Sequence, residues 1–113
     1  MHFEKLQVWR RSKDLCVDVY RALSGCRDYG FRDQITGSAL SISSNIAEGM
    51  GHQSRKEKVR YLNIAKASTS EFKSQTYIAA EIDYVSQEQG IHWLRESEEI
   101  AKMLHSLSQS LKP

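Results

Sequence analysis

The 113-residue sequence has a single proline and six glycines, too few for a collagen-like chain or a flexible linker. Its hydrophobic fraction of 40% argues against disorder. The two cysteines, Cys16 and Cys26, are too few and too far apart for a disulfide framework or a metal knuckle, and they suit a reduced compartment. The N-terminal segment has no apolar signal core, and no apolar run approaches the roughly 18 residues of a membrane span. We expect one small, soluble, cytoplasmic domain over residues 1–113.

The motifs of common enzymes are also missing. There is no glycine-rich phosphate loop, and the four histidines fall in neither an HExxH nor an ExxH pattern. Cys16 lies in an apolar column, where a buried, inert thiol is the ordinary outcome. We therefore expect a non-enzymatic protein without a metal or another cofactor.

What the chain does have is helical periodicity. Apolar residues over residues 3–26 form two adjacent columns at heptad spacing, and Ile35, Ala39, Ile42 and Ile46 recur at helical spacing in a second helix over about residues 31–48. The second helix is rich in small residues, which indicates close packing. Gly49 is suited to a left-handed cap at its end.

Two later helices begin at capping boxes. Ser54 and Glu57 predict the start of a third helix, which can run about 28 residues because no proline or glycine occurs between Gly51 and Gly90. Ser86 and Gln89 predict the start of a fourth helix. No alternating apolar run or hairpin turn predicts a strand. Four amphipathic helices with short connections favour an all-α fold, an antiparallel up-down four-helix bundle.

Basic residues gather in two places, although the net charge is only +2. One group begins next to Trp9, and the other occupies the first turns of the third helix, where free backbone N–H groups can also hold a phosphate. The groups are Arg10, Arg11 and Lys13, and Arg55, Lys56, Lys58 and Arg60. They are either solvated helix faces or a surface that contacts a polyanion. Because affinity grows with the number of phosphates neutralised, a ring of subunits would bind better than one chain.

Two acidic residues have polar neighbours. Glu48 follows Asn45 at the end of the second helix, where the helix dipole disfavours a negative charge, and Glu71 follows Ser68 within the third helix. These four residues form a polar site that pairs with arginine from a neighbouring helix or subunit, or a hydrogen-bonded network that fixes helix register, or they are simply exposed.

The aromatic residues indicate self-association. Eight large aromatic side chains are many for so thin a core, so some of them should lie on the surface and mark an interface. They are Trp9, Tyr20, Tyr29, Phe31, Tyr61, Tyr77, Tyr84 and Trp93.

Several motifs together resemble those of the 23S rRNA intervening-sequence proteins. The most specific is Ser-Ile-x-x-Asn-Ile-Ala-Glu-Gly over residues 41–49. It is accompanied in the expected order by Phe3-x-x-Leu6-x-Val8-Trp9, Tyr29-Gly30-Phe31-x-x-Gln34, Ser54-x-Lys56, Tyr61-Leu62-x-Ile64-Ala65 and Ser68-x-x-Glu71. The resemblance covers nearly the whole chain. It implies an up-down bundle that assembles as a homopentamer, is encoded within or near insertions in 23S rRNA genes, and binds nucleic acid such as structured rRNA.

A related protein, the accessory protein of diversity-generating retroelements, partners a reverse transcriptase. The alternative role is therefore a protein-interaction scaffold without a direct nucleic-acid function. The chain also departs from the family pattern. Thr36 and Gly37 stand where arginines are common, Ala67 replaces a usual glycine, and the proline before Tyr29-Gly30 is missing. The loss of the arginines removes expected anion contacts or partners for Glu48 and Glu71.

Overall fold

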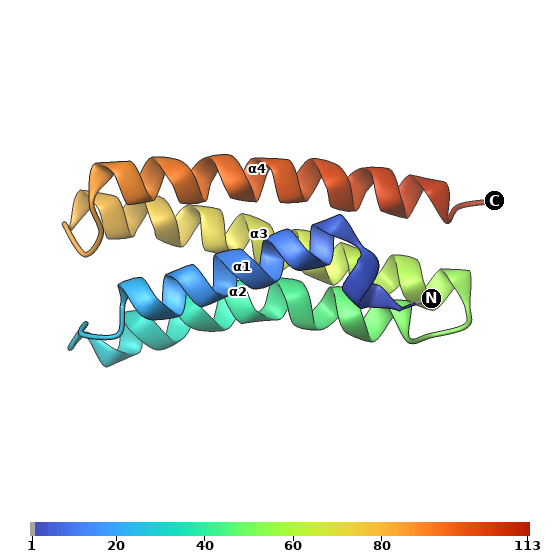
Figure 1. Ribbon diagram of the computed structural model, residues 1–113, viewed down its shortest axis with the longest axis horizontal. Coiled ribbons are helices and arrows are strands. Elements are labelled where there is room, and N and C mark those ends of the chain that lie inside the picture. The colour runs from blue at the N-terminus through green and yellow to red at the C-terminus, as the bar shows by residue number, and fades with distance from the viewer. Residues whose placement is uncertain (1) are drawn as a thin grey trace.

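Helices make up all the regular structure of residues 2–113, the part of the chain that the computed structural model describes (Figure 1). A short 3-10 turn comes first and four long helices follow. Their bounds are η1 (Phe3–Lys5), α1 (Gln7–Ala22), α2 (Tyr29–Met50), α3 (Arg55–Glu81) and α4 (Gln87–Ser110). The prediction of an all-α fold is confirmed.

The starts of three helices follow from local capping chemistry. The Ser54 hydroxyl accepts a hydrogen bond from the Glu57 backbone amide at 3.3 Å, and the Ser86 hydroxyl accepts one from the Gln89 amide at 3.0 Å. Both serines therefore cap the third and fourth helices at the predicted positions. Asp28 caps α2 in the same way and accepts from the Phe31 amide at 3.1 Å, so α2 starts at Tyr29, two residues earlier than expected.

Two other boundaries differ from the sequence prediction. The first helix is shorter than residues 3–26, because the chain forms a 3-10 turn and then extends at Leu6 before α1 begins. The prediction of a left-handed cap at Gly49 is wrong. No glycine in residues 2–113 has a positive φ, and α2 continues to Met50. Gly49 serves close packing instead, because a Cβ there would lie 2.8 Å from the Cβ of Tyr61.

Neighbouring helices run antiparallel. Ser38 bonds Gln75 and Ser41 bonds Ser68, so residue numbers rise along α2 while they fall along α3. α4 likewise runs antiparallel to α1 and α3. The helices pack in the cyclic order α1–α2–α3–α4, so that α1 contacts α2 and α4 but not α3. The bundle measures 45 × 21 × 20 Å (Figure 1).

The core lies along the bundle axis. The predicted column of α2, Ile35, Ala39, Ile42 and Ile46, is fully buried. Trp93 of α4 is also fully buried, and its indole N–H donates to the Asp18 carboxylate of α1 at 2.7 Å. Cys16 is buried as predicted, and burial raises the pKa of its thiol.

Candidate nucleic-acid interface

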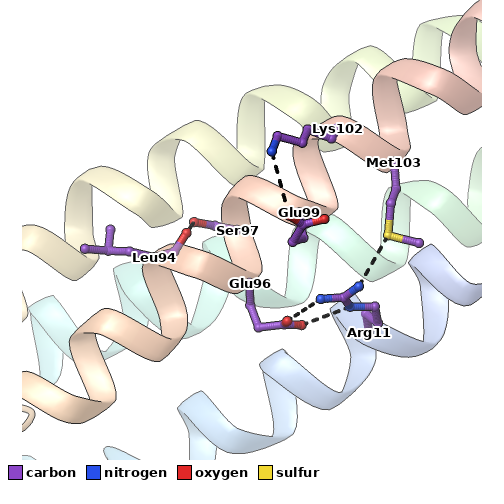
Figure 2. A network of polar contacts seen from close by, with 7 residues as sticks. All are labelled: Arg11, Leu94, Glu96, Ser97, Glu99, Lys102 and Met103. Carbon is purple, nitrogen blue, oxygen red and sulfur yellow. Dashed lines mark hydrogen bonds and ion pairs between the residues drawn. The ribbon is translucent and has the colours of Figure 1, made fainter.

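The basic residues of α1 lie near the middle of the bundle and have partners within it. Arg11 reaches across to α4, where its Nη2 lies 2.5 Å from Oε1 of Glu96 and its Nε 3.3 Å from Oε2 (Figure 2). The Arg10 side chain donates to the Glu4 carbonyl at 2.7 Å, and Lys13 pairs with the adjacent Asp14 at 2.7 Å.

Arg11 acts as a clamp between helices. The hydrogen bonds that Arg11 donates to Glu96 raise the pKa of the guanidinium, the charge of Glu99 adds to the effect, and burial opposes it. Because both carboxylate oxygens of Glu96 occupy the guanidinium, Arg11 has little capacity left for a phosphate. Its partner is 85 residues away in the sequence, and no local pattern could have identified it.

Two basic residues of α3 are also engaged internally. The Lys58 ammonium donates hydrogen bonds to the carbonyl of Met50, the last residue of α2, and to that of His52 in the following connection. Lys58 is half-buried. Arg60 donates to Glu57 at 2.7 Å and lies over the ring of Tyr61, 4.5 Å from its centroid.

Arg55 and Lys56 are different. Both are exposed, and neither forms an ion pair or a side-chain hydrogen bond with any residue in the range 2–113. They border an apolar groove of about 400 Å³ at the end of the bundle, together with Lys112 and the side chains of Val59 and Leu111. Of the seven predicted contacts, these two are the ones that are exposed and have no hydrogen-bond or ion-pair partner for the side chain within residues 2–113.

The seven predicted residues do not form one patch, because α1 and α3 occupy opposite corners of the bundle. The fold does concentrate charge lengthwise. We define the basic half of the bundle as residues 2–14, 41–67 and 100–113. It contains the start of α1 and α3 and the end of α2 and α4. It has eleven basic and four acidic residues, a net charge of +7. The acidic half (15–40 and 68–99) has five basic and ten acidic residues, a net charge of −5.

Two of the four predicted polar residues, Ser68 and Glu71, line a groove between α2 and α3. The Asn45 amide donates to the carbonyl and hydroxyl of Ser41, at 2.8 and 2.9 Å, and the Ser41 hydroxyl bonds that of Ser68 at 2.7 Å. Asn45 and Ser68 thus belong to one network, connected by Ser41. Glu71 lines the same groove, which we name the α2–α3 groove.

Glu48 and Glu71 stand apart from this network. Both are exposed, and within residues 2–113 neither forms an ion pair or side-chain hydrogen bond. Gly37, at the groove edge, has open space where a Cβ would lie, while the Thr36 hydroxyl donates to the Arg32 carbonyl at 2.7 Å.

The aromatic residues divide as expected. Tyr20, Tyr29 and Tyr77 are about half exposed, at 46%, 59% and 52%, whereas Trp93 is buried. No helix among the described residues is long and apolar enough to cross a membrane. In the same range, no three His, Cys, Asp or Glu side chains are arranged to hold a metal ion.

The fold and surface define a class of protein: a small antiparallel four-helix bundle with charge separated along its axis. The chain matches the family of 23S rRNA-intervening sequence proteins over residues 4–106, and it belongs to that family. A solved relative is a protein of unknown function from the S23 ribosomal protein family of Bacteroides thetaiotaomicron. It shares 28% sequence identity with a TM-score of 0.83, over 89% of this chain and 97% of that chain. No curated protein matches the sequence.

Proposed function

We propose that this protein is a non-enzymatic, cytoplasmic homo-oligomer that binds structured nucleic acid, with rRNA as the first candidate. The observation that carries the proposal is the charge separation, net +7 against net −5, with Arg55 and Lys56 exposed at the basic end. A surface of this kind attracts phosphates without reading bases. The homopentameric state is what the family resemblance implies. It would place several basic halves beside one polyanion, so that individually weak contacts add up.

The proposal excludes part of the predicted contact set. Arg11 and Lys58 stabilise the bundle, because their donors are occupied by Glu96 and by backbone carbonyls. Arg55 and Lys56 supply the phosphate contacts. Arg10, Lys13 and Arg60 add to the positive electrostatic potential of the basic half. The absence of arginine at Thr36 and Gly37 does not affect this surface, because both residues belong to the acidic half.

The test is binding of a fluorescently labelled RNA hairpin, measured by anisotropy over a range of salt concentrations. Arg55→Glu/Lys56→Glu should lower the affinity by about tenfold or more at low salt and flatten its dependence on salt. The matched control is Arg27→Glu/Arg95→Glu, which makes the same charge change in the acidic half and should have a small effect. Equal losses in both variants, or binding that salt does not weaken, would contradict the proposal.

A protein scaffold, for instance for a reverse transcriptase, is the second candidate. The exposed apolar side chains of α2 and α3, among them Leu40 and Ile78, favour a protein contact. Affinity capture from nuclease-treated lysate separates the two roles. A scaffold retains its partner protein, whereas a complex bridged by RNA falls apart.

A further inference from the structure

The outward surface of α2 and α3 is nearly free of charge. No charged residue occurs between Gln34 and Ala47, which is most of α2. Between Tyr61 and Ala80 of α3 only three residues are charged, and Lys73 turns toward α4, where it pairs with Glu98 at 3.2 Å. Lys66 lies one heptad before Lys73, hence on the same side of α3. On the side of α3 next to α2, Glu71 is the single charged residue of that stretch.

This side of α3 has the pattern of a helix interface. Six residues follow one another at alternating spacings of four and three, the spacing of a seam that packs against a helix. Ser68 and Gln75 bond α2, which fixes the seam beside that helix. The three isoleucines of the seam remain exposed even so: Ile64 (37%), Ile78 (46%) and Ile82 (46%). The seam is Ile64, Ser68, Glu71, Gln75, Ile78 and Ile82.

The facing side of α2 allows a close approach. Gly37, Leu40 and Ser44 share its outward side at spacings of three and four, and Leu40 is 46% exposed. One exposed apolar side chain is ordinary, but several around one groove form a patch that a partner covers. With Glu48 and Glu71 unpaired, a fitting partner presents apolar side chains and basic groups together.

The chain itself has such a surface on α1. Val17 and Tyr20 are exposed, at 39% and 46%, and they lie between Lys13 and Arg21 on the outward side of that helix. The Lys13–Asp14 ion pair is exposed to solvent, so a stronger partner can replace it at little cost. Because α1 does not pack against α3, a chain cannot use its own α1 to cover its α2–α3 groove. A contact between two different surfaces is heterologous, the kind that builds closed rings.

We propose that the α2–α3 groove of one copy receives the outward side of α1 from a second copy, with Glu71 and Glu48 facing Lys13 and Arg21. This inference rests on the self-association in the proposed function. It adds which surfaces meet and why Glu71 lies at the centre of an otherwise uncharged seam: a charged contact within an apolar interface fixes the register of the two copies.

The test is the mass of the purified, nuclease-treated full chain in solution, measured by light scattering. The groove variant, Glu48→Lys/Glu71→Lys, and the α1 variant, Lys13→Glu/Arg21→Glu, should each fall to the mass of one chain, 13.0 kDa. Combining the four changes restores opposite charges across the contact and should restore the oligomer. Glu4→Lys/Glu88→Lys is the matched control. These two carboxylates, like those of Glu48 and Glu71, are exposed and form no ion pair within residues 2–113, so this variant should keep the mass of the unchanged protein. Circular dichroism verifies that every variant remains helical.

The outcomes separate the two proposals. If the unchanged protein has the mass of a single chain, self-association itself is refuted. If it is an oligomer and the groove variant keeps that mass, self-association stands and this interface is wrong. If each pair of changes disperses the oligomer but the combination does not restore it, the pairing of α1 with the groove is wrong.

Discussion

Gly37 and Gly49 both lie inside α2, yet the structure assigns them opposite roles. At Gly37 an added Cβ meets nothing within 4 Å, so Gly37→Ala should stabilise the fold by about 0.5–1 kcal/mol through helix propensity. At Gly49 the added Cβ lies 2.8 Å from the Cβ of Tyr61 and 3.3 Å from the Lys58 carbonyl oxygen, so Gly49→Ala should cost about 1–3 kcal/mol. Denaturant unfolding at matched protein concentrations measures both changes. A shift of the same sign in the two variants would contradict the packing described for Gly49.

The same contrast marks the limit of sequence reasoning for single residues. A glycine near a helix end predicts a cap from local geometry, but contact with Tyr61 of the next helix decides what Gly49 does. Arg11 and Lys58 look like surface cations in the sequence, yet each binds oxygen atoms inside the bundle. Local sequence shows a residue's charge, and distant partners determine whether that charge is free.

Whole helices were easier to predict than single contacts, because the signals that begin them are local. Ser54 and Ser86 each cap a helix within three residues of their own position. The apolar column of α2 is buried as its spacing predicts. The early start of α2 depends on Asp28, which caps the helix although Phe31, and no Glu or Gln, stands three residues later. Asp28 also accepts a hydrogen bond from the Tyr84 hydroxyl at 2.7 Å. This bond joins the loop between α1 and α2 to the loop between α3 and α4.

This connection makes stability depend on pH. Hydrogen bonds from Tyr84 and from the Phe31 amide lower the pKa of the Asp28 carboxyl. A carboxyl with a lowered pKa in the folded state stabilises the fold above its unfolded pKa of about 3.9, and the contribution disappears as the pH falls through the folded pKa. Tyr84→Phe should therefore lower Tm between about pH 5 and 8, and the difference from the unchanged protein should shrink below about pH 4. Tyr77→Phe is the control, since the exposed Tyr77 hydroxyl forms no hydrogen bond within residues 2–113. A difference in Tm that is the same at every pH would contradict this role for Asp28.

At the scale of the whole molecule, the fold produces properties that the linear sequence obscures. The net charge of +2 hides a division into net +7 and net −5 halves, which exists only because the helices alternate in direction. The uncharged stretch of α2 is visible in the sequence, but only the packing order shows that α3 extends it into a surface and that α1 lies elsewhere. The polar residues Asn45 and Ser68 meet through Ser41 for the same reason.

The two proposals together predict that the groove variant binds RNA more weakly, whereas its added positive charge alone would make it bind more tightly. Glu48→Lys/Glu71→Lys raises the net charge of each chain by four, and Glu48 belongs to the basic half. If one chain bound RNA by itself, the added charge would raise the affinity. If affinity comes from several basic halves held in one assembly, dispersal of the oligomer should weaken binding to the RNA hairpin by about a hundredfold, although no phosphate-binding residue has changed. Anisotropy titrations compare this variant with Glu4→Lys/Glu88→Lys, which makes the same change of net charge but should keep the oligomer. Tighter binding by the dispersed groove variant would show that a single basic half is sufficient.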